Sequence, residues 1–214
     1  MKILQISDLH LAPGNQDMHG VNPNDRLTQC VENIQQNHAD AELCVITGDL
    51  AHKGEIGAYE ILRDILAGLP MPYHLLVGNH DDRKKLLSVF PNTPVDPNGF
   101  IQSVVDLEIG RLIFIDTVEI GEKFGGFCAQ RAEWLENQLK DSAGRPVYLF
   151  LHHPPFDVGI PYMDGMRMLR GEDLLAEIVG PFTNIRHMFL GHLHRPIAGS
   201  WNGIPFSVFR GTAH

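Results

Sequence analysis

Long apolar runs, clusters of basic residues and paired cysteines are all missing from this sequence of 214 residues. A helix that crosses a bilayer needs roughly 20 apolar residues, and no stretch of the chain approaches that length. The first residues, Met1–Ile6, turn polar too soon for a signal peptide. We therefore expect neither a membrane partner nor a secretory leader.

Cysteine is scarce, with only Cys30, Cys44 and Cys128, and no Cys-x-x-Cys spacing occurs. An odd number of widely separated cysteines favours free thiols and a reducing compartment. We expect a cytoplasmic protein, with Cys44 buried in a strand. Any metal site in this chain must then use donors other than thiolate.

Positive charge is also in short supply. Lysine and arginine number 17 against 26 acidic residues, which gives a formal net charge of −9. Binding along a polyanion usually needs clustered basic residues, so a nucleic-acid polymer is a poor candidate partner. The length and the ordinary hydrophobic content of 43% predict one globular domain over residues 1–214.

Short apolar runs typical of strands alternate with segments that have the apolar period of helices, which predicts a mixed α/β fold. The first part of the chain alternates strand and helix, which indicates a parallel sheet. Hairpin turns follow at residues 108–111 and at Asn202-Gly203, and they favour two packed sheets covered by helices. The predicted strands are 1–7, 43–47, 73–77, 101–107, 112–116, 147–151, 187–190, 197–201 and 205–209. The predicted helices are 25–37, capped by Asp25, and 56–66, 84–89, 131–139 and 172–179.

Five short polar segments each follow a predicted strand. They are Asp8-Leu9-His10, Gly48-Asp49, Gly78-Asn79-His80-Asp81, His152-His153-Pro154-Pro155 and Gly191-His192-Leu193-His194. Residues two apart in a strand point the same way. Asp8 and His10 can therefore converge on one point, as can His192 and His194. Ligands of α/β sheets collect at the carboxyl ends of strands, where all five segments fall. Glycine at three of them allows a close backbone approach.

The donors in these segments are two carboxylates, one amide oxygen and several imidazoles. This mixture suits Mn, Fe, Co or Zn and is too rich in nitrogen for Ca or Mg alone. A carboxylate can bridge two ions, and Asp49 is the natural candidate. Paired ions about 3.5–4 Å apart generate a hydroxide at neutral pH and clamp the oxygens of an in-line displacement. The sequence thus predicts two divalent metal ions and the hydrolysis of phosphate esters.

The motifs D-x-H, G-D, G-N-H-D, H-H-P-P and G-H-L-H, in this order, resemble the calcineurin-like metallophosphoesterase superfamily. Within it, Ile6-Ser7-Asp8-Leu9-His10 and Gly78-Asn79-His80-Asp81-Asp82 look most like the class III cyclic-nucleotide phosphodiesterases and the related bacterial glycerophosphodiesterases. The resemblance implies a four-layer α-β-β-α sandwich of two mixed sheets. It also implies that a metal-bound hydroxide hydrolyses small phosphodiesters.

Carried over by position, the resemblance implies a role for each donor. One metal would be held by Asp8, His10, Asp49 and His194, and the other by Asp49, Asn79, His152 and His192. His80 would bind no metal. It would lie beside the scissile phosphate and either stabilise charge or protonate the leaving oxygen. Asn79 and His80 would both contact the substrate.

Other branches of the superfamily fit less well. The Ser/Thr protein phosphatases resemble G-D-x-V-D-R-G, whereas this chain has Gly48-Asp49-Leu50-Ala51-His52-Lys53-Gly54. Pyrophosphatases of the lipid A pathway usually carry Arg where His80 stands. DNA-repair nucleases are typically longer, and purple acid phosphatases use a Tyr ligand that these motifs lack.

Residues outside the motifs are interpreted more plainly. His153 either orients a ligand or simply packs. We expect ordinary surface or packing roles for His19, His38, His52, His74, His187 and His214, and a solvated surface for Glu119–Glu122. The Met-rich loop Phe156–Gly171 is expected to rim the pocket, with Arg167 or Arg170 either meeting a phosphate or lying in solvent. Asn15–Asn24 is a candidate for the opposite rim.

The substrate stays open between 3′,5′-cyclic nucleotides and glycerophosphodiesters. Alternatives are a phosphomonoesterase, a nucleotide pyrophosphatase, and a non-catalytic metal-bearing scaffold. The scaffold should have lost ligands, and all seven are present. Metal identity and homo-oligomer formation are also open. The phosphodiesterases that this chain resembles often continue past the point corresponding to Gly211-Thr212-Ala213-His214, so we keep a missing C-terminal segment as an expectation.

Overall fold

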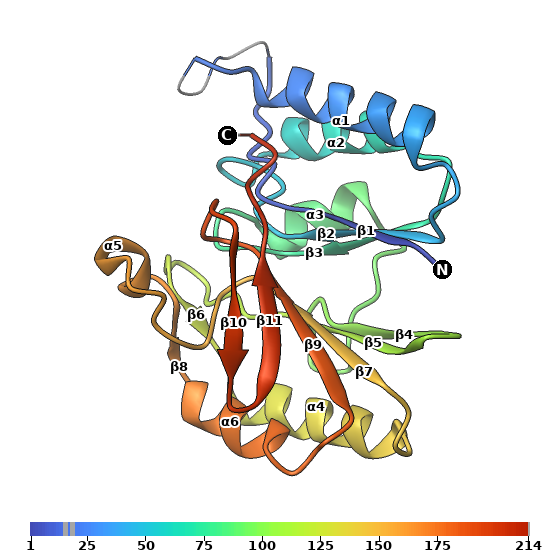
Figure 1. Ribbon diagram of the computed structural model, residues 1–214. Coiled ribbons are helices and arrows are strands. Elements are labelled where there is room, and N and C mark those ends of the chain that lie inside the picture. Colours follow the sequence, from blue (N-terminus) through green and yellow to red (C-terminus); the bar gives the residue numbers. More distant parts are fainter. Residues whose placement is uncertain (15–16, 18–19, 214) are drawn as a thin grey trace.

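The first of two principal sheets is built from the N-terminal strands. This computed structural model describes residues 1–14, 17 and 20–213. Strands β1 (Ile3–Ile6), β2 (Leu43–Thr47) and β3 (Tyr73–Leu76) lie side by side in that order, with parallel pairing throughout (Figure 1). All five residues of the central β2 are buried, as expected for a parallel strand covered on both faces.

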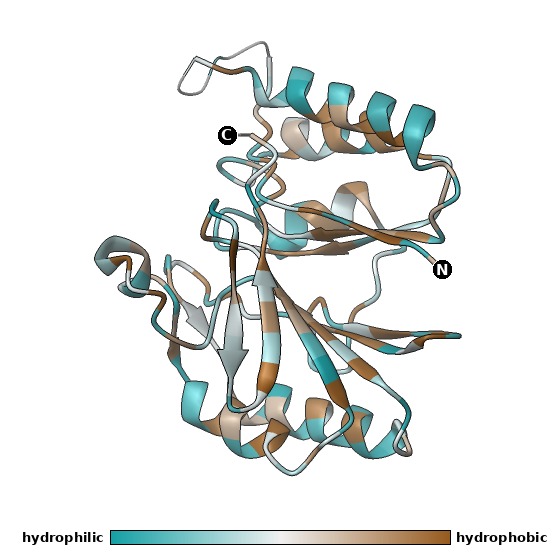
Figure 2. Cartoon of the chain, viewed as in Figure 1, coloured by the Kyte–Doolittle hydropathy of each residue, from teal (hydrophilic) through white to brown (hydrophobic). Residues whose placement is uncertain are grey.

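Three helices cover the outer face of this sheet: α1 (Pro23–Asn37), α2 (Ile56–Leu66) and α3 (Arg83–Val89). In α1 the buried Leu27, Val31 and Ile34 recur at helical spacing, while the outward face is hydrophilic (Figure 2). Asn22, rather than Asp25, caps α1, so that prediction was wrong. The Asn22 side chain accepts the backbone N–H groups of Asn24 and Asp25, and Pro23 suits the first helical position.

The second sheet has six strands and is mixed. In spatial order they are β10 (Ile197–Trp201), β11 (Ile204–Val208), β9 (Ile185–Leu190), β7 (Val147–Leu151), β5 (Gly110–Ile115) and β4 (Ser103–Leu107). The two outer pairs are antiparallel hairpins, and the central pairs are parallel. Helices α4 (Ala129–Asp141) and α6 (Glu172–Val179) cover its outer face (Figure 1).

Apolar side chains fill the space between the two sheets. Leu43, Val45 and Leu76 of the first sheet pack on Leu112, Phe114 and Phe150 of the second. One further apolar cluster lies between each sheet and the helices that cover it. The predicted four-layer α-β-β-α arrangement is confirmed. The prediction that both sheets are mixed was wrong for the first sheet, which contains parallel pairs alone.

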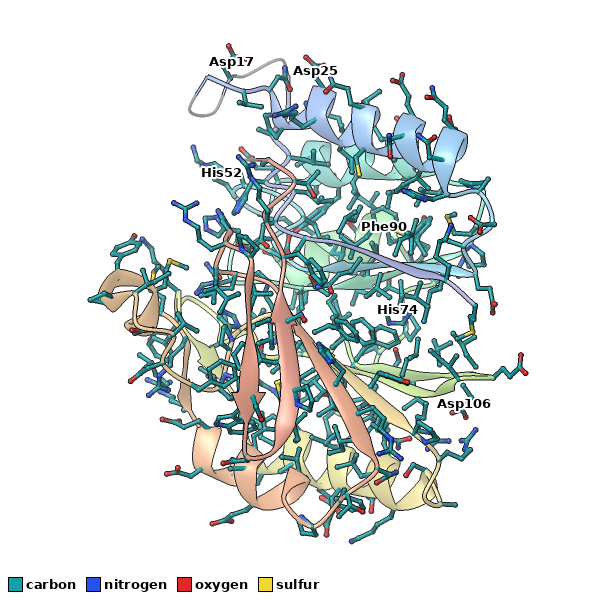
Figure 3. The ribbon with its side chains drawn as sticks, in the orientation of Figure 1. Asp17, Asp25, His52, His74, Phe90 and Asp106 are labelled. Carbon is teal, nitrogen blue, oxygen red and sulfur yellow. The ribbon has the colours of Figure 1, made fainter. Side chains whose placement is uncertain are left out.

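His74 of β3 also lies in this middle layer (Figure 3). Its ring stacks on Phe114 with centroids 3.8 Å apart, and its Nε2 is 3.0 Å from the hydroxyl of Ser103. Burial lowers the pKa of His74 to about 4. The predicted packing role of His74 is confirmed.

The sequence did not reveal a small third sheet. Strand β6 (Gly125–Gly126) pairs with β8 (Met168–Arg170), and a short helix α5 (Pro161–Asp164) precedes β8 inside the predicted loop Phe156–Gly171. The two glycines of β6 carry no strand signal, because glycine is depleted from strands. Among the described residues, no helix combines the length and apolar character needed to cross a membrane.

The segment before β6 also differs from expectation. Glu119 was predicted to be solvated surface, yet its carboxylate lies 3.1 Å from the buried guanidinium of Arg131. Arg131 also donates to the carbonyl oxygens of Val118 and Gly126. A buried guanidinium needs acceptors for its charge, so Glu119 is a structural partner.

Candidate metal centre

The predicted donors gather at one end of the two sheets. Asp8 and His10 follow β1, Asp49 follows β2, and Asn79 and His80 follow β3. From the second sheet, His152 follows β7, and His192 and His194 follow β9. The site is therefore shared by both sheets, at the carboxyl ends of three parallel strands of the first sheet and two parallel strands of the second.

The backbone at these donors is not strand-like. Asp8, His10, Asp49, His192 and His194 have φ values of 54°, 47°, 51°, 71° and 52°. Strand β1 ends at Ile6 and β9 at Leu190, so the predicted strand alternation at these donors was wrong, although the paired donors do converge. Left-handed backbone is uncommon for residues other than glycine and clusters at functional sites.

One group of donors comprises Asp8, His10, Asp49 and His194, whose ligand atoms lie within 4.8 Å of one another. The Nε2 atoms of His10 and His194 are 3.1 Å apart. His194 Nε2 is 3.2 Å from Asp8 Oδ1, and His10 Nε2 is 3.6 Å from Asp49 Oδ2. Two carboxylates and two imidazoles that converge in this way form a set able to hold a divalent metal.

A second group lies on the other side of Asp49. His152 Nε2 is 3.4 Å from Asp49 Oδ1, while His152 Nδ1 is 2.7 Å from the carbonyl oxygen of Thr47. Because a carbonyl only accepts, Nδ1 carries the hydrogen, and Nε2 faces the site. Burial disfavours the charged ring, but the Asp49 carboxylate outweighs it and raises the pKa of His152 to about 9.

Buried atoms without hydrogen-bond partners test whether metal would fit here. Asp8 Oδ2, Asn79 Oδ1 and His192 Nε2 are buried and lack such a partner among the described residues. The buried His152 Nε2 also makes no hydrogen bond there, and its contact with Asp49 Oδ1 is an ion pair at 3.4 Å. Leaving a buried polar atom unsatisfied costs about 1–3 kcal/mol, so several at one place need an explanation. Metal ions would satisfy all four, and the donor set fits them.

Asp49 stands between the two groups. Its Oδ2 faces His10, whereas its Oδ1 faces His152 and accepts the backbone N–H of His80 at 3.0 Å. The carboxylate is 2% exposed. Burial alone would raise the pKa of Asp49, but the neighbouring His152 and His10 hold it well below its ordinary value. This is the position that a bridging carboxylate requires.

Glycines let the backbone approach these donors, as the sequence predicted. A Cβ at Gly78 would lie 2.2 Å from Asp49 Oδ1, and one at Gly48 would lie 2.6 Å from His152 Nδ1. At Gly191 it would lie 2.6 Å from the hydroxyl of Ser7. Such contacts are shorter than real side chains show, so each position excludes any other residue without movement of the site.

A brace behind the donors was not predicted. The carboxylate of the half-buried Asp81 accepts the backbone N–H groups of Leu50, Ala51 and Gly78, at 2.9–3.1 Å, together with the hydroxyl of Tyr59. It thus ties the loop after β2 to the loop after β3. Burial and the nearby Asp49 charge raise the pKa of Asp81 to about 6 against these hydrogen bonds.

His80 and His52 form a pair at the mouth of the site. His80 Nδ1 lies 2.7 Å from the main-chain carbonyl of His52, and the two rings stack with centroids 5.5 Å apart. His52 also lines the cavity described below, a position that the sequence did not predict. No motif surrounds His52 in the sequence, and only the fold brings it here (Figure 3).

His153 is fully buried, and it offers a ring nitrogen within 4.8 Å of ring nitrogens of His152 and His192. Its ring is 4.8 Å from that of His152 and 4.7 Å from that of His192, and its Nδ1 is 2.8 Å from the Thr117 hydroxyl. Burial and the two neighbouring imidazoles hold its pKa well below the ordinary value. Contact with both rings favours the orienting role over simple packing.

An open cavity of about 620 Å³ lies in front of the donors. Cavities of about 300–1,000 Å³ are typical of small-molecule sites. Its lining comprises His10, Asp49, His52, Asn79, His80, Lys123, Ile160, Tyr162, Met163, Met166, His192, Leu193, His194 and Arg195. The site is therefore open to a small ligand.

The family model described as calcineurin-like phosphoesterase matches residues 1–196 of this chain. The chain belongs to that family. The family membership predicted from the five motifs is confirmed, and with it the assignment to the phosphoesterases.

Curated relatives of this phosphoesterase cover nearly all of it. It is 42% identical to a probable cyclic nucleotide phosphodiesterase of Rhodopseudomonas palustris, over 100% of this chain and 79% of the relative. It is 29% identical to the probable glycerophosphodiester phosphodiesterase GpdQ of Arcobacter nitrofigilis, over 95% and 76%. It is also 29% identical to the 3′,5′-cyclic adenosine monophosphate phosphodiesterase CpdA of Escherichia coli K12, over 95% of this chain and 73% of the relative.

Solved structures support the fold. A dimetal phosphatase from Danio rerio superposes with a TM-score of 0.76 at 16% identity, over 99% of this phosphoesterase and 87% of that chain. Purple acid phosphatase from yellow lupin reaches 0.68 at 15% identity, over 98% and 44%. At these identities the likeness concerns the fold alone.

The Met-rich loop lies at the edge of the cavity, as predicted for this phosphoesterase, but its arginines do not. The loop Phe156–Gly171 does line the cavity, but neither of its arginines does. Arg167 pairs with Asp157 at 2.6 Å and with Glu172 at 3.3 Å, and Arg170 lies over the Phe124 ring. Neither is placed to meet a phosphate in the cavity, so that alternative was wrong.

The opposite rim gains no support. Asn24 donates to the carbonyl oxygens of Ala12 and Gly14, and the described residues of Asn15–Asn24 do not line the cavity. Residues 15, 16, 18 and 19, including His19, lie outside the described residues, as does His214.

Proposed function

We propose that this phosphoesterase hydrolyses small phosphodiesters, 3′,5′-cyclic nucleotides or glycerophosphodiesters, with two divalent metal ions. The observation that carries the proposal is the position of Asp49. Its two oxygens face two separate donor groups, and the His80 backbone is fixed on one of them. Relatives named for both substrate classes support the choice of phosphodiesters.

The seven donors would hold the ions as the motifs predict. Asp8, His10, Asp49 and His194 would take one ion, and Asp49, Asn79, His152 and His192 the other. When bound, the ions would neutralise the phosphoryl oxygens and activate a water for attack. The imidazole-rich set favours Mn, Fe, Co or Zn over Ca or Mg.

The chain's own groups would handle binding and the leaving group. Lys123 and Arg195 line the cavity and attract an anionic diester. Asn79 and His80 would contact the phosphate. As the water oxygen bonds to phosphorus, one ester P–O bond breaks, and the departing oxygen takes the Nε2 proton of the cationic His80 ring. The attacking water gives up one proton to solvent, and the now neutral His80 ring takes a proton from solvent before the next turnover. The Nδ1 contact with the His52 carbonyl leaves Nε2 for this task.

Turnover by metal-loaded protein tests the proposal. Protein reconstituted with Mn, Fe, Co or Zn should hydrolyse bis(p-nitrophenyl) phosphate, and then cyclic AMP or a glycerophosphodiester. Turnover of p-nitrophenyl phosphate should be weaker. Asp49→Asn should lose both metal and activity, whereas Asp25→Asn, at the exposed first turn of α1, should keep both. Absence of diester turnover with every metal would refute the proposal. Faster turnover of the monoester would indicate a phosphomonoesterase instead.

We also propose a cytoplasmic location. The three cysteines form no disulfide, and burial raises the pKa of Cys44 to about 12, so its thiol is inert. The expectation of a non-catalytic scaffold finds no support, because the donors converge and an open cavity faces them. Fractionation of cells that express the tagged chain would test the location.

A further inference from the structure

Part of the cavity lining is apolar. Ile160, Tyr162, Met163 and Met166, which we call the apolar wall, come from α5 and its flanks. The rest of the lining presents mainly imidazole, carboxylate, amide and cationic groups. Figure 1 shows α5 at the left edge of the molecule, the side on which Figure 3 places His52. The site thus offers one polar and one apolar surface to a ligand.

The segment that carries the wall is held in place by its own contacts. The Phe156 ring lies 4.4 Å from that of Phe206, and the Asp164 carboxylate accepts the backbone N–H of Val158 at 2.7 Å. The Met168 N–H donates to the carbonyl oxygen of Pro154 at 2.9 Å. Pro154 belongs to the His152-His153-Pro154-Pro155 motif, so the wall is anchored to the segment that supplies a metal donor.

Tyr162 is the unusual member of the wall. It is 72% exposed, although large aromatic side chains usually bury most of their surface. An exposed aromatic ring at the edge of a cavity is a platform on which a planar group can stack. Met163 and Met166 are unbranched and polarisable, so they adapt to the edges of such a group.

Charge decides which group the wall would accept. The exposed cations of the cavity are Lys123 and Arg195, and its one carboxylate, Asp49, is buried among the donors. A quaternary ammonium group also stacks on tyrosine, but these two cations would repel it. A neutral planar ring attached to an anionic phosphate meets no such repulsion.

We propose that the apolar wall binds the planar base of a 3′,5′-cyclic nucleotide, with Tyr162 as the stacking residue. The proposal rests on the proposed function and narrows it, because a glycerophosphodiester has no ring to place there. Tyr162 is then a specificity residue: it binds the base and leaves the reacting atoms to the donors and His80.

The test compares two substrates in metal-loaded enzyme, cyclic AMP and glycerophosphocholine. Tyr162→Ala should lower kcat/KM for cyclic AMP about tenfold, mainly through KM, because one stacked base is lost. The same variant should change kcat/KM for glycerophosphocholine less than twofold. Tyr162→Phe should retain most of the wild-type preference, since it keeps the ring.

Ile120→Ala supplies the matched control, because Ile120 is 89% exposed and outside the cavity lining. It should behave as wild type with both substrates. Equal losses on both substrates in Tyr162→Ala, no loss, or a larger loss on glycerophosphocholine would each overturn the inference. Wild-type enzyme that prefers glycerophosphocholine would also overturn it while leaving the proposed function intact. Wild-type enzyme that cleaves no diester would instead refute the proposed function.

Discussion

His80 Nδ1 lies 2.7 Å from the main-chain carbonyl oxygen of His52. A carbonyl oxygen can only accept, so this contact fixes the hydrogen on Nδ1 and leaves Nε2 for the proposed proton transfer. The partner is backbone, and it is therefore independent of the side chain at position 52.

Replacing His80 tests this assignment. His80→Gln should lower kcat on bis(p-nitrophenyl) phosphate by about 10²–10⁴-fold, the usual contribution of a general acid. Metal content, measured by plasma mass spectrometry, should stay at the wild-type level, because the seven donors remain. His52→Ala is the matched control and should lose less than tenfold, since the carbonyl survives. Equal losses in the two variants would contradict the assignment.

Gly78 offers a purely steric test of the metal site. A Cβ there would lie 2.2 Å from Asp49 Oδ1 and 2.7 Å from His152 Cε1. Gly78→Ala should therefore displace the carboxylate and reduce both metal content and kcat, the latter at least a hundredfold. Gly57→Ala, whose Cβ would meet only Pro13 at 3.4 Å and which lies within α2, should keep full activity. Full activity in Gly78→Ala would show that Asp49 need not hold its place.

Metal removal should destabilise the fold, because the donors come from both sheets. Binding at about 100 times Kd contributes roughly 2.7 kcal/mol. For a chain of this size that corresponds to a fall in Tm of about 5–10 °C on chelation. Scanning calorimetry with EDTA, and then with excess Mn or Co, measures the fall and its recovery. In Asp49→Asn, EDTA should have little effect. A metal-stripped wild type with unchanged Tm would count against metal ions that join the sheets.

His74 should make stability depend on pH. Its folded pKa is about 4, below the ordinary 6.5, so the unfolded chain binds more protons between these values. The free energy of unfolding should fall as pH drops from 6.5 to 4, by up to about 3 kcal/mol from this group. Urea denaturation at pH 7.5 and 4.5 measures the change. His74→Phe keeps a ring beside Phe114 and should show a smaller loss. An equal loss would assign the effect to other groups.

The convergence of the proposed donors could be predicted because metal chemistry restricts both residue type and order along the chain. Asp8, His10 and Asp49 each follow an apolar run, and such runs are visible in the sequence. The left-handed backbone at these residues could not be predicted. It results from tertiary contacts, such as the hydrogen bond from the Asp8 N–H to the carbonyl of Gly48.

Other features were missed for similar reasons. Asp81 follows the Gly-Asn-His motif, but nothing local shows that its carboxylate reaches the loop after β2. Tyr162 lies in a segment without periodicity, so its place in the cavity depends on anchors elsewhere, such as Phe156 on Phe206. The cap of α1 was misplaced by three residues, because Asn22 and Asp25 are both good capping residues.

The division of the donors between the two sheets has a consequence for biosynthesis. Each of the two proposed metal positions needs a residue from the Gly191–His194 segment, His194 for one and His192 for the other. While a ribosome is still making the first 190 residues, neither position has its full set of ligands. Both ions would therefore gain their full set of ligands only late, after β9 has joined its sheet.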